Sequence, residues 1–299
     1  MTLCIIGGAG FVGNRTLMRM QGPVRALAHR RALDVPDTVE GDAADPAVLA
    51  HLLEPGAVVL NLAYEAARAE KLAEALGAAC ATRGVRRLVH VSTSSVYGAA
   101  PGALIDENTQ CAPRTSYERA KHAVEDILER HAAGRFELVL LRPTAVFGPG
   151  GRNLEALAMR VLREGWPRRY IRACAMGRRH MHAVDVEYVA AAALFLVAAP
   201  LDAAVERFIV SQDEEPMNNY RSLEDFFVAR FAAAPYPVPP LSVPPAALRV
   251  ALRIAGRSDV EPRRRYSGAR LRARGFREPR PFGAALEEYA RWIGRHARP

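Results

Sequence analysis

The feature that most constrains the fold of this chain is an apolar run near the N-terminus that ends in closely spaced glycines. Leu3–Ile6 has the composition of a short, buried parallel strand. Glycines occupy positions 7, 8, 10 and 13, and residues 14–20 have a helix-like composition. Glycine lets the backbone approach a pyrophosphate closely, and the first N–H groups of a helix point at such an anion. The stretch therefore predicts a phosphate cradle, although its Gly-x-x-Gly-x-x-Gly spacing differs from the standard dinucleotide fingerprint and also fits a plain tight turn.

Length and composition favour one large α/β domain with a smaller lobe. The 299 residues exceed the usual size of a single core, and 50% of them are hydrophobic. The net charge of +9 favours anionic ligands, but we recognise no nucleic-acid-binding module. The longest apolar run, residues 189–200, is too short to span a bilayer, and the N-terminus enters a strand without a signal peptide. We therefore expect a cytoplasmic protein with no nucleic-acid or membrane partner.

The four cysteines, at positions 4, 80, 111 and 174, lie far apart in the sequence. None of them forms a Cys-x-x-Cys pair or has a histidine at zinc-site spacing. We expect free thiols of a reducing compartment and no metal site.

Apolar runs alternate with helical segments along the first part of the chain. The pattern predicts strands around residues 23–31, 39–45, 57–63 and 84–91, and a helix over residues 65–83. Such β-α-β alternation predicts a doubly wound parallel sheet, in which ligands bind at the carboxyl ends of the strands.

The exit of the second predicted strand is basic. NAD-preferring sites usually carry an acidic residue here to hold the ribose 2′-hydroxyl, whereas a basic residue accommodates the 2′-phosphate of NADP. The chain has His29, Arg30 and Arg31 at this point, and its next carboxylate is Asp34. This favours NADP over NAD; the alternative is that the arginines are solvated and that Asp34 turns back to the ribose.

Polar residues also follow the third and fourth predicted strands. Asp42, in the turn after the third strand, can accept a hydrogen bond from an adenine amino group. Equally, the acidic residues of this turn can serve the next helix, since Asp45 before Pro46 is a typical helix cap. Residues 61–64 end the fourth strand, where they are expected to line the cofactor cleft.

A hydroxyl cluster and a Tyr-x-x-x-Lys pair carry the catalytic signal. Ser, Thr and Tyr are concentrated in residues 92–98, directly after the predicted fifth strand. Tyr117 and Lys121 are four residues apart on a predicted helix and so share one face. A tyrosine with a pKa near 10 is a poor base at neutral pH, but a neighbouring ammonium favours the phenolate and lowers that pKa. The pair predicts an acid/base group with a hydroxyl nearby to bond the substrate oxygen.

Further landmarks follow in a fixed order. After the glycine turn, Asp42, the 92–98 stretch and the Tyr117/Lys121 pair come residues 141–150 (Leu-Arg-Pro-Thr-Ala-Val-Phe-Gly-Pro-Gly) and 179–186 (Arg-His-Met-His-Ala-Val-Asp-Val). Together they resemble the extended short-chain dehydrogenases/reductases of the NAD-dependent epimerase/dehydratase family. The chain departs from the family at Ile6, where Thr is frequent, and in lacking an Asn-Val-x-Gly-Thr signature before the fifth strand.

The resemblance implies a role for each matching residue. Tyr117 would be the acid/base, Lys121 its partner, and Thr93 the catalytic hydroxyl, with Ser92 or Ser94 in its place if the register differs. The residues implied to bind the cofactor are Gly7, Gly10, Phe11, Val12, Gly13, His29, Arg30, Asp42, Ala43, Leu62, Ala63, Tyr117, Lys121 and Pro143. The residues implied to bind the substrate are Ser94, Asn153 and Arg179.

We expect a dinucleotide-binding Rossmann domain over residues 1–150, to which residues 180–200 return. Residues 151–179 and 201–299 then form the substrate-binding lobe. Its predicted elements are a helix over 154–163, an irregular segment over 166–170, a strand over 208–210, and helices over 222–231 and 246–255. Candidate phosphate ligands are Arg152, Arg168, Arg169, Arg172, Arg178 and Arg179. His182 is expected to pack near Asp185 in a structural role.

The resemblance implies an NAD(P)-dependent sugar-nucleotide epimerase that acts by transient hydride transfer. It also implies a homodimer through helices 65–83 and 117–131. Dehydration is disfavoured, because Ser94 and Ser95 stand where family dehydratases have an Asp-Glu pair. One alternative is an NADPH-dependent ketoreductase of a sugar or small carbonyl substrate. Another is a non-catalytic NADP-binding module, against which the intact Tyr117 and Lys121 argue.

Overall fold

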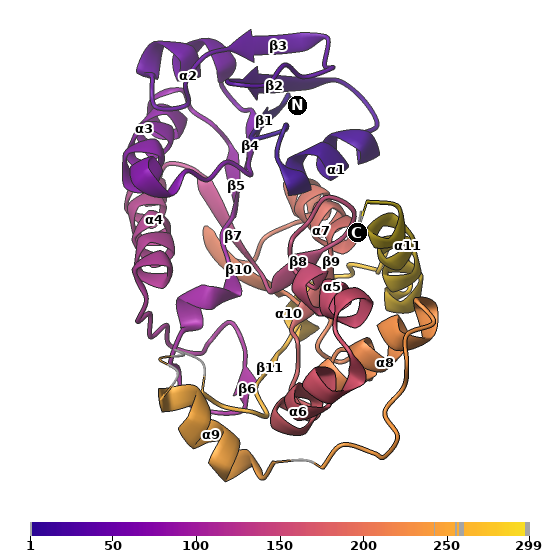
Figure 1. Cartoon of the computed structure of the whole chain (residues 1–299). Helices are drawn as coiled ribbons and strands as arrows, with labels where there is room; N and C mark the ends of the chain where they lie inside the picture. Colours follow the sequence, from indigo (N-terminus) through magenta and orange to yellow (C-terminus); the bar gives the residue numbers. More distant parts are fainter. Residues whose placement is uncertain (1, 242, 255, 257–259, 297–299) are drawn as a thin grey trace.

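A parallel sheet of seven strands forms the centre of the computed structural model, which describes residues 2–241, 243–254, 256 and 260–296 (Figure 1). The strand order is β10-β7-β5-β4-β1-β2-β3. The strands are β1 (Leu3–Ile6), β2 (Val24–Ala28), β3 (Asp37–Glu40), β4 (Val58–Asn61), β5 (Arg87–Val91), β7 (Glu137–Pro143) and β10 (Val205–Val210). All neighbouring pairs are parallel, which confirms the predicted doubly wound sheet.

Helices cover both faces of this sheet because alternate residues of each strand point to opposite sides. Cys4 and Ile6 of β1 belong to one core cluster, beneath α2 (Pro46–Leu52), α3 (Ala69–Thr82) and α4 (Ser116–Ala132). Leu3 and Ile5 belong to the second cluster, with α7 (Val186–Ala198). On this second face α7 packs beside α1 (Phe11–Arg19). A short 3-10 helix, η1 (Ala66–Arg68), precedes α3, and another, η2 (Ser94–Tyr97), follows β5.

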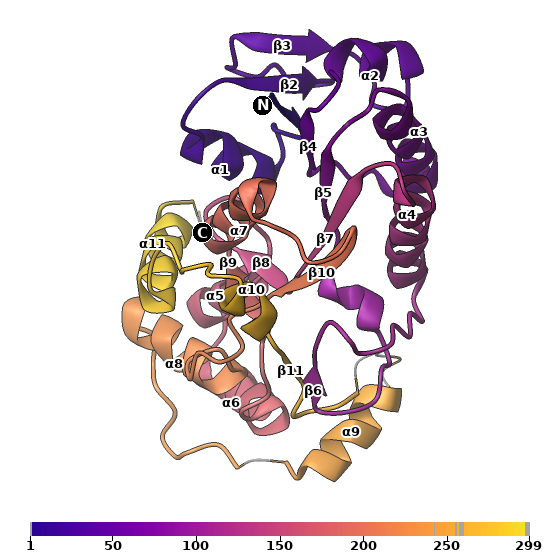
Figure 2. The same ribbon diagram turned by 180° about the vertical axis from the view of Figure 1, so that it is seen from behind.

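The remaining helices gather into a lobe at the far side from α2 and α3 (Figures 1 and 2). They are α5 (Glu155–Arg163), α6 (Trp166–Met176), α8 (Tyr220–Arg230), α9 (Pro245–Ile254), α10 (Ala269–Ala273) and α11 (Phe282–His296). Helices α5, α8 and α11 share a third core cluster that contains Leu157, Phe227 and Tyr289. Two small parallel sheets join lobe and sheet domain: β8 (Ala145–Phe147) pairs with β9 (Ala183–Asp185), and β6 (Leu104–Ile105) pairs with β11 (Arg265–Tyr266).

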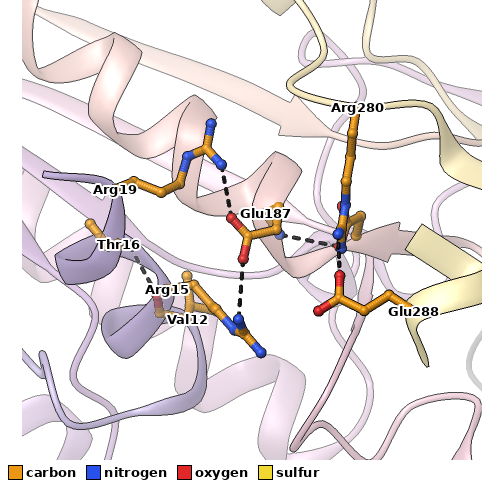
Figure 3. Close-up of polar contacts among 8 residues, drawn as sticks. Val12, Arg15, Thr16, Arg19, Glu187, Arg280 and Glu288 are labelled. Carbon is orange, nitrogen blue, oxygen red and sulfur yellow. Dashed lines mark hydrogen bonds and ion pairs between the residues drawn. The ribbon is translucent and has the colours of Figure 1, made fainter. Parts of the chain in front are cut away.

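An ion-pair network fastens the first helix to the C-terminal part of the chain (Figure 3). Arg15 and Arg19 of α1 both reach Glu187 at the start of α7, with N···O distances of 3.5 and 2.9 Å. Beside it, Arg280 binds the buried carboxylate of Asp185 through two hydrogen bonds of 2.6 and 2.8 Å. The helix that begins at the glycine turn is thereby tied to the segment that leads into α11.

The structure corrects two expectations about the lobe. Residues 166–170 are not irregular but begin α6, because Pro167 lies in the first turn of a helix, where its missing N–H has no partner to lose. Strand β10 lies within the predicted lobe range 201–299, yet it is the edge strand of the central sheet. Its residues pair with β7 from Val205 opposite Leu138 onward. The predicted helix over 246–255 matches α9, and residue 255 lies outside the described residues.

Candidate active site

The glycine turn between β1 and α1 leaves no room for side chains. Gly7 has a φ of +86°, and a Cβ there would lie 2.5 Å from the backbone nitrogen of Ala63. A Cβ on Gly13 would lie 2.1 Å from the carbonyl oxygen of Gly7. Helix α1 begins after Gly10 with no side-chain cap. The turn therefore offers backbone N–H groups at close range, an arrangement that fits the pyrophosphate of a dinucleotide.

A cavity of about 380 Å³ extends from this turn toward the ends of β2 and β3. Among its lining residues are the predicted Gly7, Gly10, His29, Arg30, Asp42, Ala43, Leu62 and Ala63. The Asp42 carboxylate accepts hydrogen bonds from the Ala44 N–H (2.9 Å) and from Arg68 Nη2 (2.6 Å), and both lower its pKa. Asp45 caps α2 by accepting from the Ala47 N–H. We call this cavity the nucleotide end of the cleft.

A second cavity, of about 750 Å³, lies at the carboxyl ends of β4, β5 and β7. It shares Leu62 and Tyr64 with the nucleotide end, so the two cavities meet there. Its lining includes nine predicted residues: Val12, Leu62, Thr93, Ser94, Tyr117, Lys121, Pro143, Asn153 and Arg179. Two predicted residues line neither cavity: Phe11 faces an adjoining hollow, and Gly13 is buried beneath the turn. We call the second cavity the catalytic end.

Thr93 and Tyr117 are within hydrogen-bonding reach at the catalytic end. Thr93 caps η2 by accepting from the Ser95 N–H (3.2 Å), which fixes its side chain. Tyr117 stands in the first turn of α4, after a capping box made by Thr115 and Glu118. Ser92 and Ser94, the other hydroxyls considered, are both almost fully buried. Thr93 is thus the hydroxyl that the fold pairs with Tyr117.

The expected effect of Lys121 on Tyr117 is wrong for this state of the protein. Burial raises the pKa of the Tyr117 phenol, the hydrogen bond with Thr93 opposes that rise, and Tyr64 adds to it. The Lys121 ammonium lies over the Tyr64 ring instead, 3.8 Å from its centroid, in a cation–π contact. The rings of Tyr64 and Tyr117 pack edge to face, with their centroids 5.9 Å apart. Tyr64 therefore lies against both members of the predicted pair.

Lys121 is itself buried, with 4% of its surface exposed. Burial lowers the pKa of its ammonium to about 8, although the nearby Glu125 carboxylate acts in the opposite direction. The adjacent His90 is also buried, which lowers its pKa to about 3, and its Nδ1 lies 3.0 Å from Asn61 Nδ2. A lysine close to its titration point can respond to a ligand that changes its surroundings.

One expected residue, Tyr64, and three residues that sequence reasoning missed complete the wall of the catalytic end. Tyr64, Met181, His182 and Tyr266 line the catalytic end. The Nδ1 of His182, which was expected to pack near Asp185, lies 2.6 Å from Oδ2 of Asp213. Tyr64 belongs to residues 61–64, which the sequence placed at the end of the fourth strand. The other three come from segments without a recognisable spacing, so no sequence signal marked them.

A basic cavity lies behind this wall. Its volume is about 380 Å³, and its lining includes Arg178, His180, Arg263 and Arg265. Within the described part of the chain, no carboxylate pairs with these three arginines, whereas Arg172, another phosphate candidate, pairs with Glu164. Arg169, also a candidate, is buried and donates to the carbonyl of Ala234. Among the described residues, no helix is long and apolar enough to cross a membrane, and no cluster of His, Cys, Asp and Glu could hold a metal.

Comparisons with known proteins identify relatives of this architecture. The model of the NAD dependent epimerase/dehydratase family matches residues 3–210. No curated protein matches the sequence.

Solved structures of similar fold include MoeE5 in complex with UDP-glucuronic acid and NAD, at 21% identity and a TM-score of 0.70, with 99% of each chain covered. DesIV, a dTDP-glucose 4,6-dehydratase from Streptomyces venezuelae, is 18% identical with a TM-score of 0.71 and covers 99% of this chain and 98% of its own. A UDP-glucose 4-epimerase is 16% identical with a TM-score of 0.72 over the same shares.

Proposed function

Since this chain belongs to the NAD-dependent epimerase/dehydratase family, we propose that it is a nucleotide-sugar epimerase that acts through Tyr117, Lys121 and Thr93. One observation carries the proposal: the Thr93–Tyr117 hydrogen bond and Lys121 lie in one cavity that meets the nucleotide end. The glycine turn, in which a Cβ would collide with backbone, fits a dinucleotide pyrophosphate. When bound, the dinucleotide would supply the acceptor and donor of a hydride.

The chain's own residues handle the proton. Tyr117 would take the proton of the sugar hydroxyl as that carbon is oxidised and return it on reduction. Thr93 would hold the same oxygen by a hydrogen bond. Because the pKa of Tyr117 is raised while Tyr64 lies against it, the phenol is protonated at neutral pH in this state. To act as a base it needs the Lys121 ammonium uncovered and close, which favours the phenolate.

For the cofactor we propose NADP in preference to NAD, although the MoeE5 and DesIV structures contain NAD. His29, Arg30 and Arg31 line the nucleotide end, where a 2′-phosphate would meet them. The guanidinium of Arg30 is 73% exposed, and its contact with Glu65 is long, at 3.4 Å. Asp42 is engaged by Ala44 and Arg68. The basic side chains thus outweigh the acids available to a ribose hydroxyl.

For the substrate we propose a nucleotide diphosphate sugar. Its sugar would occupy the catalytic end, beside Ser94, Asn153 and Arg179, and its phosphates would extend toward the basic cavity. Arg178 and Arg265 there offer guanidinium groups that have no carboxylate partner among the described residues, and a guanidinium can bind two phosphate oxygens at once.

A second candidate is an NADPH-dependent ketoreductase of a sugar or small carbonyl compound. The protonated Tyr117 phenol favours it, since a reductase needs only to donate a proton to a carbonyl oxygen. The homodimer through α3 and α4, which pack side by side, stays a prediction.

The test uses UDP-glucose, UDP-glucuronic acid and dTDP-glucose, each with NAD and NADP, and follows the sugar by NMR. We expect one of them to be epimerised by the wild type. Tyr117→Phe should lower the rate by about 10² to 10⁴-fold, the usual share of a general acid/base. Tyr170→Phe, in the lobe and outside both cavities, is the matched control. No turnover of any sugar would overturn the nucleotide-sugar proposal, and dinucleotide consumption on carbonyl compounds alone would support the reductase.

A further inference from the structure

The cavity that contains Tyr117 is also lined by a histidine paired with a buried aspartate. His182 directly precedes β9, and Asp213 follows β10, so two crossing segments bring them together. The Nδ1–Oδ2 distance is 2.6 Å, short enough for a charge-assisted hydrogen bond. The Asp213 side chain is fully buried, whereas His182 is 16% exposed and lines the catalytic end.

The aspartate is held in place by backbone and side-chain donors. Its Oδ2 accepts from the Tyr266 N–H at 2.8 Å, and its Oδ1 accepts from Asn218 Nδ2 at 3.4 Å. A carboxylate fixed in this way accepts a hydrogen bond from the Nδ1–H of the ring and so sets the tautomer of the neutral imidazole. Nε2 is then the ring nitrogen at which a proton can be exchanged with a ligand, as in other Asp–His pairs.

The backbone of His182 and two neighbouring rings also hold its side chain in place. His182 has a φ of +54°, a region that non-glycine residues rarely adopt and that persists where the surroundings enforce it. Its ring stacks on His180, with centroids 6.1 Å apart, and meets the Tyr266 ring edge-on at 5.0 Å. Its carbonyl accepts from the Ala145 N–H at 2.8 Å. The other ionisable side chains that line the cavity are Tyr64, Tyr117, Glu118, Lys121, Arg179 and Tyr266.

We propose that His182, paired with Asp213, is a second proton-transfer group that acts on a carbon beside the carbonyl of a ketosugar nucleotide. The inference rests on the proposed substrate class. A carbonyl makes the hydrogen on its neighbouring carbon acidic. Nε2 of His182 would take this proton, and the electron pair of the broken C–H bond would form an enolate. Return of a proton to that carbon restores the ketone, so no oxidant or reductant is needed. Return to the opposite face inverts that carbon.

The test supplies the ketone ready-made. UDP- and dTDP-4-keto-6-deoxyglucose are incubated with the protein in D₂O without added dinucleotide, and NMR follows deuterium uptake at the carbons beside the carbonyl. The wild type should exchange these hydrogens well above the buffer rate. His182→Asn should lower exchange by about 10²-fold or more, since its amide can still donate to Asp213 but takes up no proton, and asparagine tolerates a positive φ.

Two controls separate proton transfer from a structural role. His122→Asn changes another histidine paired with an aspartate, Asp126 at 3.0 Å on α4, outside the cavities described above, and should leave exchange within about twofold. Asp213→Asn keeps the shape and should lower exchange about 10-fold, an effect expected of an orienting partner. In histidine ¹⁵N spectra of the wild type, His182 should carry its proton on Nδ1, and Asp213→Asn should shift that signal.

Wild-type exchange no faster than buffer, equal losses in His182→Asn and His122→Asn, or an unshifted His182 signal in Asp213→Asn would each overturn the inference. Because the probe already contains the ketone, its exchange does not depend on Tyr117. Exchange of this probe by a protein that oxidises no nucleotide sugar would uphold the inference and overturn the proposed function.

Discussion

At the nucleotide end of the cleft the chain builds its site mainly from backbone, whereas at the catalytic end it uses side chains from distant segments. A Cβ at Gly7 or Gly13 would overlap backbone atoms, so the shape of the turn follows from local sequence. At the catalytic end, Thr93 and Tyr117 face His182 and Tyr266, which come from the second half of the chain. At the nucleotide end, backbone atoms packed against the glycines fix the shape of the site. At the catalytic end, side-chain packing and charge fix it.

The two ends also differ in readiness. The nucleotide end is an open cavity whose basic side chains reach into solvent. At the catalytic end, Tyr64 covers Lys121, and Tyr117 has a raised pKa and is protonated at neutral pH. We infer from this difference that binding of the dinucleotide needs little change in the protein. Catalysis needs a rearrangement around Tyr64.

Gly13→Ala should disrupt the glycine turn at the nucleotide end. The added Cβ would lie 2.1 Å from the Gly7 carbonyl oxygen, so the turn must shift. We expect at least about 3 kcal/mol off the free energy of unfolding, measured in urea, and a loss of dinucleotide binding. Gly294→Ala in α11 is the control, since no described atom beyond its own helix backbone and chain neighbours lies within 4 Å of the added Cβ, and alanine favours a helix. Equal stabilities of the two variants would contradict a sterically closed turn.

Lys121→Met tests whether the catalytic end holds a buried lysine with a lowered pKa. The pKa of Lys121 is about 8 in the folded protein and 10.5 unfolded, so between these values the unfolded chain binds more protons. The wild type should therefore gain up to about 3 kcal/mol of stability relative to Lys121→Met as the pH rises from 8 to 10.5. Unfolding curves of both proteins across this range check it. A pH-independent difference would show that Lys121 is solvated.

Tyr64→Ala tests the difference in readiness. Removing the ring that covers Lys121 should strengthen NAD binding about fivefold, in line with one cation–π contact, and leave ADP binding unchanged. Titration calorimetry with both ligands measures this. Tyr64→Phe is the matched control, because it keeps the ring and removes a hydroxyl that has no hydrogen-bond partner. The same change for ADP and NAD would mean that Tyr64 does not distinguish the ends.

Arg30→Ala should have the smallest effect. Its guanidinium is 73% exposed, so its contact with a 2′-phosphate is screened by solvent. We expect the ratio of NADP to NAD affinity to fall about threefold, with Arg295→Ala on the last helix as the control for net charge. A ratio that stays constant would assign the 2′-position to other residues.

The strands and the glycine turn could be predicted because apolar runs and glycines act locally. Leu3–Ile6 is continuous and buried, and Gly7 has the positive φ that its place in the turn requires. Thr93, Tyr117 and Lys121 could be proposed from the sequence because their spacing lies within one strand end and one helix, and the structure places all three in one cavity. Sequence spacing could not show that Tyr64 would lie over Lys121, or that burial would raise the pKa of Tyr117.

The pairing of His182 with Asp213 also could not be predicted from the sequence, since it depends on how the segments beside β9 and β10 meet in space. The same limit explains β10 itself. Its apolar residues predicted a strand, but only the register with β7 places it in the sheet and not in the lobe.

Transient oxidation of the sugar is tested most directly with an isotope. UDP-glucose, UDP-glucuronic acid and dTDP-glucose, deuterated in turn at each ring carbon that bears a hydroxyl, are mixed with the wild type and NADP or NAD. The reaction is quenched during turnover, and the mass of the dinucleotide is measured by mass spectrometry. We predict that one labelled position passes its deuterium to the reduced dinucleotide, and that Tyr117→Phe abolishes the transfer. Epimerised sugar with an unlabelled dinucleotide at every position would contradict the proposed mechanism.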